Sequence, residues 1–304
     1  MQPTGSGSVA AENLRGICFM VAAVGAFSVM DALIKWLSPT FPVMQILLFR
    51  AAFALVPIVL LISRLGGLSA LRTQNYAGHL GRSLLTTLAL IGFIYAFGQM
   101  PLADVVAIGF SAPLFITALS LPMLGERVGT RRWAAVLAGF IGVIIMVRPG
   151  AGVFDQVALV ALAATVCYAL GIISIRLLNR TETTAALAFY VNVNSLLAAL
   201  LAVPFGFVWP TWMQAAELIA VGLIGGLAQL LLTIAYRLAP VAVVAPFDYT
   251  AMLYVVLFGY IFFGDLPDKS LIMGAVIVIG SGLYILHQEA RCAWSEHNDQ
   301  TSIG

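Results

Sequence analysis

Ten long apolar runs dominate this 304-residue chain, and each is near the length that a helix needs to cross a hydrocarbon core. They are expected at roughly 15–37, 42–63, 77–98, 103–123, 131–148, 153–178, 184–205, 213–236, 240–263 and 270–287. Only 9% of the residues are charged, whereas a water-soluble protein carries about a quarter. Because the runs are continuous rather than alternating, they exclude a β-barrel and predict an all-α membrane protein with ten transmembrane helices.

The second half of the chain repeats the first with a shift of 139 positions, which aligns residues 96–126 with 235–265. The matched residues include Phe97 with Tyr236, Pro101 with Pro240, Phe110 with Tyr249, Ser111 with Thr250, and Glu126 with Asp265. Five spans in each repeat are an odd number, so the halves should cross the bilayer in opposite senses. Pro113 and Pro246 interrupt the fourth and ninth spans, and paired interruptions of this kind point to a binding site. Ordinary tolerance of proline in membrane helices is the alternative.

The distribution of Lys and Arg predicts that both termini are cytoplasmic. With that orientation the outer side receives only Lys35, Arg50, Arg148 and Lys269, and every other Lys and Arg falls inside. We therefore divide the chain into a disordered cytoplasmic tail (1–14), a first five-helix repeat (15–148), an inverted second repeat (153–287) and a cytoplasmic tail (288–304).

Three charged residues lie within about 12 Å of the outer interface, counted at about 1.5 Å per helical residue: Asp31, Lys35 and Arg50. A charge inside a membrane span is costly and usually has a partner or a function. In one interpretation Asp31 binds a substrate ammonium, and Arg50 or Lys35 binds its carboxylate. In the other, Asp31 and Arg50 form a structural ion pair and Lys35 extends to the interface.

Asp248 is a second carboxylate inside an apolar span, and it has no basic residue within its own helix. A proton-coupled exporter needs a carboxyl that binds and releases a proton near neutral pH, and Asp248 is the best candidate in the chain. A structural, hydrogen-bonded or protonated Asp is the alternative.

Polar and aromatic residues scattered through the spans could line a cavity for an amphipathic, ring-bearing substrate. We include Phe27, Ser28, Tyr95, Gln99, Tyr168, Asn192, Gln229 and Tyr249 in the candidate set. Each of them could instead hold helices together through hydrogen bonds. His79 and Arg82 share a face at the inner start of the third span, where they could form part of an inner gate or contact lipid headgroups.

Two segments carry a resemblance to a known family: PLADVVAIGFSAPLFITALSLPMLGERVGTRRWAAVLAGFIGVIIMV in the first half and PVAVVAPFDYTAMLYVVLFGYIFFGDLPDKSLIMGAVIVIGSGLYIL in the second. The chain resembles the EamA-type transporters of the drug/metabolite transporter superfamily over residues 15–287. The resemblance implies two inverted five-helix repeats, a central cavity, and export or exchange of small polar metabolites. Within the family, the general character of the sequence, rather than a diagnostic motif, resembles that of bacterial exporters of aromatic amino acids.

Other function classes have little support in the sequence. Asp31 and Asp248 could serve an intramembrane aspartyl protease, and a channel is also conceivable. However, the sequence has no metal motif, no nucleophile turn and no phosphate-binding loop, so we expect no enzyme, no metal and no cofactor. We expect a monomer in the bacterial inner membrane whose partners are lipid and a small-molecule substrate. A net charge of +2 argues against nucleic acid.

Overall fold

The computed structural model describes residues 6–64, 71, 73, 75–124, 130–147, 153–178 and 183–301, and these residues are almost entirely helical. The first half contains α1 (Ser6–Leu37), α2 (Val43–Arg64), α3 (Tyr76–Gln99), α4 (Leu102–Gly109), α5 (Ala112–Leu124) and α6 (Thr130–Val147). The second half contains α7 (Val153–Leu178), α8 (Thr184–Ala202), η2 (Val203–Phe205), α9 (Trp212–Leu238), α10 (Val241–Val244), η3 (Ala245–Thr250), α11 (Ala251–Phe258), η4 (Gly259–Phe263) and α12 (Lys269–Thr301).

The lengths of these helices confirm a multi-pass membrane protein. Within the described residues, nine segments are long and apolar enough to cross a membrane, and Trp133–Val147 of α6 is a shorter apolar helix. The predicted tails differ from the structure, because α1 already begins at Ser6 and α12 continues to Thr301. Residues such as Ala, Glu, Gln and Arg at these ends favour helix even outside an apolar layer. Residues 1–5 and 302–304 of the tails lie outside the described residues.

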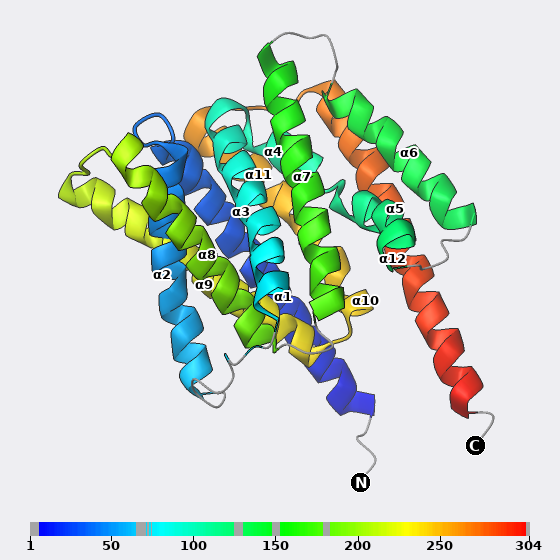
Figure 1. The fold of residues 1–304 in the computed structure, drawn as a ribbon. Helices are drawn as coiled ribbons and strands as arrows, with labels where there is room; N and C mark the ends of the chain where they lie inside the picture. The colour runs from blue at the N-terminus through cyan, green and yellow to red at the C-terminus, as the bar shows by residue number, and fades with distance from the viewer. Residues whose placement is uncertain are drawn as a thin grey trace.

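The helices pack in pairs that match across the two halves. α1 packs against α9 as α7 packs against α3, and α2 packs against α9 as α8 packs against α3. The equivalent helices α2 and α8 contact each other, as do α6 and α12. Figure 1 shows that α1 leads away from the end of the bundle that holds both termini, whereas α7 leads back toward it. This pattern is the one expected of two repeats related by a two-fold axis in the membrane plane.

The fourth and ninth spans are both interrupted, as the matched prolines predicted. The fourth breaks at Phe110 and Ser111, between α4 and α5, and the ninth passes through the 3₁₀ helix η3. At each break a hydroxyl donates to the carbonyl three residues earlier: Ser111 Oγ to Ile108 O at 2.6 Å, and Thr250 Oγ1 to Phe247 O at 2.6 Å. These matched bonds satisfy the two hydroxyl donors inside an apolar span, and Ile108 O also accepts from Ser111 N at 3.0 Å.

Candidate functional site

The two interrupted spans meet through residues that occupy the same position in the two repeats. The ring of Phe110, at the break between α4 and α5, packs edge-on against Tyr249 of η3, with ring centroids 4.9 Å apart. A residue that contacts its own equivalent must lie close to the axis that relates the repeats. The Phe110–Tyr249 contact therefore lies near that axis, at the interface of the two repeats, and transporters built from inverted repeats bind their substrate at this interface.

Tyr249 is also held by α12. Its hydroxyl lies where a Cβ on Gly282 would be, so only glycine leaves room for the ring at that position. The Tyr249 hydroxyl is buried and has no hydrogen-bond partner within the part of the chain that the structure describes. A buried hydroxyl without a partner is costly. It is therefore available to a polar group of a bound molecule or to water.

Asp248, next to Tyr249, is the predicted carboxylate whose surroundings best fit a binding role. Its side chain is exposed, although it lies within an apolar span. Tyr168 of α7, Tyr236 of α9 and Tyr249 all lie within electrostatic range of it. These tyrosines come from three separate elements, α7, α9 and η3. The arrangement combines one carboxylate with several aromatic rings.

One stripe of α9 changes from packed to open along its length. Gly222, Gly226, Gln229, Thr233 and Tyr236 follow each other at spacings of four and three residues, which places them on one helix face. Near the start of α9, Gly222 and Gly226 lie against the backbone of α2. Toward its end, Gln229 and Tyr236 are exposed, and 41% of the surface of Tyr236 is accessible.

The equivalent stripe of α3 stays closed. Leu90, Ile94 and Phe97 are the counterparts of Gln229, Thr233 and Tyr236, and Ile94 and Phe97 are only 2% and 6% accessible. The two repeats thus differ in side-chain exposure at these matched positions. Figure 1 shows that α9 ends toward the end of the bundle that holds the termini and that α3 ends toward the opposite end, so the exposed and the buried stripe lie toward opposite ends.

The predicted outer cluster is divided between two places. Asp31 and Arg50, on α1 and α2, are both half-buried and interact electrostatically, but they form no direct ion pair in the described part of the chain. Lys35 lies one turn further along α1 and pairs instead with Asp265, at 3.0 Å. The carboxylate of Asp31 therefore interacts electrostatically with the cation of Arg50, whereas the carboxylate of Asp248 interacts with tyrosines. The two carboxylates do not share the surroundings that a catalytic pair of aspartates requires.

The proposed inner gate residues join α3 to α8. Arg82 Nη1 donates to the carbonyl oxygen of Leu187 at 2.7 Å, and the buried His79 ring packs 4.6 Å from the ring of Tyr190. Further along the same helices the hydroxyls of Thr87 and Ser195 bond at 2.7 Å. These contacts favour an interhelical role for His79 and Arg82 over contact with lipid headgroups.

The remaining candidates divide into satisfied and accessible side chains. Ser28 Oγ and Asn192 Nδ2 donate to carbonyls of their own helices, Val24 O and Ala188 O, both at 2.9 Å. Phe27 packs against the apolar core. By contrast, Tyr95, Gln99 and Gln229 are exposed. The accessible residues are better placed to contact a solute than Ser28 and Asn192, whose polar groups already have partners.

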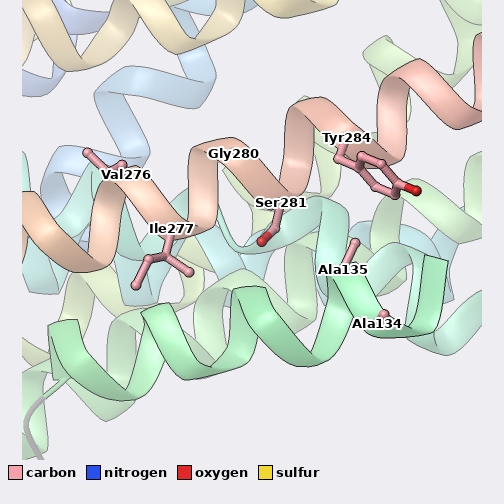
Figure 2. Close-up of a pocket in the computed structure, with 7 residues that line it drawn as sticks. All are labelled: Ala134, Ala135, Val276, Ile277, Gly280, Ser281 and Tyr284. Carbon is pink, nitrogen blue, oxygen red and sulfur yellow. The ribbon is translucent and has the colours of Figure 1, made fainter. Parts of the chain in front are cut away.

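A separate groove lies between α6 and α12, and Figure 2 shows the residues that line it. Its volume is about 460 Å³, and its lining is mainly apolar, with Ser281 and Tyr284 as the polar exceptions. None of the predicted site residues borders it. The groove is lined by α6 and α12, and Gly282 of α12, which contacts Tyr249, is next in the chain to the lining residue Ser281.

Sequence reasoning did not include Phe110, Tyr236 and Asp265 among the site residues. The repeat alignment contained the signal, because Phe97 and Tyr236, Phe110 and Tyr249, and Glu126 and Asp265 are matched pairs. Glu126 lies outside the described residues.

Comparison with known proteins agrees with the two-repeat organisation. The model of the EamA-like transporter family matches residues 14–148 and again residues 156–286. One solved structure, described only as "Crystal structure of protein", superposes with a TM-score of 0.64 at 20% identity, covering 93% of this chain and 99% of its own. At that identity the likeness concerns the fold alone.

Several curated bacterial relatives cover almost the whole chain. A riboflavin transporter of Rhizobium johnstonii is 32% identical, covering 93% of this chain and 96% of its own. A pseudopaline exporter of Pseudomonas aeruginosa is 30% identical, covering 87% and 93%. An S-adenosylmethionine uptake transporter of Rickettsia prowazekii is 26% identical, covering 94% and 97%. All three are named as transporters, and none is named for an aromatic amino acid.

Proposed function

Because the chain belongs to the EamA-like transporter family, we propose that it is a secondary transporter for a small, amphipathic, ring-bearing metabolite. The substrate binds at the Asp248 site, which we define as Asp248, Tyr168, Tyr236, Tyr249 and Phe110. The observation that carries this proposal is an exposed carboxylate surrounded by tyrosines from three elements, at the place where the two interrupted spans meet.

The chemistry of this site suits a molecule with a flat ring and a polar or cationic group. Tyrosine rings offer apolar faces for stacking and attract cations, and their hydroxyls can donate or accept hydrogen bonds. Asp248 can accept hydrogen bonds from an ammonium, amide or hydroxyl group. The buried, unpartnered hydroxyl of Tyr249 would supply one more polar contact if a change in packing against α12 exposed it.

The relatives widen the range of substrates to be tested. Aromatic amino acids are the class that the sequence suggested, and they are the smallest candidates. Riboflavin and S-adenosylmethionine, for which two relatives are named, each carry a fused heteroaromatic ring and polar groups. The relatives are named for both uptake and export, so we propose export or exchange from the sequence and leave the direction to experiment.

Counterflow in proteoliposomes tests the proposal. Vesicles loaded with unlabelled solute are diluted into the labelled form of riboflavin, S-adenosylmethionine, tryptophan or phenylalanine. A carrier accumulates label transiently and saturably for at least one of these compounds. Failure of every compound with correctly folded protein would overturn the substrate class, and non-saturable flux would favour a channel.

A matched pair of tyrosine variants locates the site. Tyr236 is 41% accessible and belongs to the Asp248 site, whereas Tyr284 is 40% accessible and borders the groove in Figure 2. Tyr236→Ala should raise the half-saturating substrate concentration about five- to tenfold, because a stacking ring is worth about 1 kcal/mol or more. Tyr284→Ala should leave it unchanged. Equal effects of the two variants would argue against a site at Asp248.

A further inference from the structure

Lys35 connects three segments at the end of the bundle opposite the termini. Its Nζ donates to Met100 O, between α3 and α4, at 2.9 Å, and pairs with Asp265 Oδ2, between η4 and α12, at 3.0 Å. The same ammonium lies 5.1 Å from the ring centroid of Phe263. One side chain at the end of α1 thus contacts the first repeat and the second repeat at once. We call this set of four residues the Lys35 clasp.

The second repeat is shaped to present Asp265 to Lys35. The π-helix η4 ends at Gly264, which has a left-handed conformation with φ of 70°. Glycine adopts this conformation without strain, whereas other residues are disfavoured there. The turn is held by bonds from Gly264 N to Tyr260 O and from Asp265 N to Gly259 O, at 3.1 and 3.0 Å. As a result Asp265 points back across the end of the bundle.

Within the described residues, the ammonium of Lys35 is also the sole polar contact of one buried oxygen, Asp265 Oδ2. Asp265 Oδ2 is buried and has no hydrogen-bond partner there besides the ion pair with Lys35. If the ammonium were withdrawn, this oxygen would be left without a partner unless water reached it. Separation of the clasp and entry of water at this end should therefore occur together.

The clasp lies at the end of the buried stripe of α3. Ile94 and Phe97 precede Met100 in the chain, and all three are buried in the same apolar cluster. The end of α3 also touches the end of α1, because a Cβ on Gly98 would lie 2.7 Å from Ser38 Cβ. At the other end of the bundle the equivalent residue of Phe97, Tyr236, is exposed.

We propose that the Lys35 clasp is the latch of a gate, and that Lys35 is the positioning residue that keeps the central site closed toward the side opposite the termini. In the structure the latch is closed while the end with the termini is open beside α9. Breaking the Lys35–Asp265 pair opens the α3 side, so that Phe97 becomes accessible. The physiological meaning rests on the proposed transport function, but the conformational statement does not.

Cysteine accessibility tests the latch without any substrate. Cys18, Cys167 and Cys292 are replaced by Ala, and a single reporter is introduced as Phe97→Cys or as Tyr236→Cys. A membrane-impermeant maleimide is then applied from each side of sealed vesicles whose orientation is fixed by a C-terminal tag. With Lys35 present, the Tyr236→Cys reporter should react from the side of the termini, and the Phe97→Cys reporter should react slowly from either side.

Lys35→Met should raise labelling of the Phe97→Cys reporter from the side opposite the termini about tenfold and lower labelling of the Tyr236→Cys reporter. Lys269→Met is the matched control, because it removes a Lys at the same end that lies outside the clasp, and it should change neither rate. Unchanged labelling of the Phe97→Cys reporter would overturn the proposal. Faster labelling of both reporters would also overturn it, since that result indicates general loosening.

Asp265→Asn provides a second variant in case Lys35→Met does not fold. The amide keeps the shape of the carboxylate and removes its charge, so the same opposite changes of the two reporters are expected. Exchange of the charges, in Lys35→Asp with Asp265→Lys, should return labelling of the Phe97→Cys reporter toward its original rate. If both reporters are labelled at the same rates in the Asp265→Asn variant as in the parent protein, the Lys35–Asp265 ion pair does not keep the gate closed. Absence of transport in the parent protein would affect only the proposed function.

Discussion

Gly222 offers a quantitative test of how closely α9 and α2 pack. A Cβ at Gly222 would lie 2.5 Å from Phe53 Cβ and 2.6 Å from Phe49 O, and the second contact is with backbone. Ordinary contact begins at about 3.4 Å, so the two helices would have to separate by roughly 0.8 Å. A carbonyl oxygen inside a helix cannot rotate away from the new methyl group as a flexible side chain would.

Gly222→Ala should therefore destabilise the protein despite the higher helix propensity of alanine. Overpacking costs about 1–3 kcal/mol. The replacement of glycine in a helix contributes about 1 kcal/mol in the opposite direction. The difference between these two terms is a net loss of about 0–2 kcal/mol of unfolding free energy, and we expect a value of about 2 kcal/mol because the clash is with backbone.

Gly81→Ala in α3 is the matched control, since a Cβ there meets nothing within 4 Å. This variant should be stabilised by up to about 1 kcal/mol through helix propensity alone. The two proteins can be compared by thermal unfolding in detergent, followed by size-exclusion chromatography of the folded fraction. A Gly222→Ala protein that is as stable as Gly81→Ala would refute the close packing of α2 and α9.

Three further variants test the charges and the turn. Asp248→Asn should fold normally, because the amide matches the carboxyl in size, but it should weaken binding of a substrate that carries a cationic group and remove dependence of the flux on a pH gradient. Unchanged affinity and unchanged pH-gradient dependence in flux assays would reduce Asp248 to a structural residue. Asp31→Asn leaves the half-buried Arg50 without its anion and should lower the free energy of unfolding by about 1–2 kcal/mol. Combining Asp31→Asn with Arg50→Gln should largely restore that stability, and a double variant as unstable as the single one would contradict the coupling of the two residues. Gly264→Ala forces a side chain into the left-handed region of backbone conformation and should lower the free energy of unfolding by about 1–2 kcal/mol. An unchanged midpoint of thermal unfolding would argue against that backbone conformation.

The sequence alone determined the environment, the number of spans and the repeat. Long apolar runs leave an α-helical membrane protein as the solution, because every backbone polar group must be satisfied inside the lipid. Pro113 and Pro246, which lie inside the fourth and ninth spans, also indicated the two interruptions, since proline removes a backbone donor from the helix. The extent of α1 and α12 was less predictable, because helix formation beyond the apolar layer depends on weak local propensity.

Only the tertiary structure decided which side chains meet. Sequence separation placed Lys35 beside Asp31, but Lys35 pairs with Asp265, more than two hundred residues away. Partners of that kind depend on how the two repeats dock, and no periodicity along one helix contains that information. The difference in side-chain exposure between Phe97 and Tyr236 likewise became visible only in the tertiary structure. The residues at these equivalent positions also differ in polarity, since Leu90 and Ile94 stand where the second half has Gln229 and Thr233, so their different exposure reflects both the local sequence and the packing of neighbouring helices.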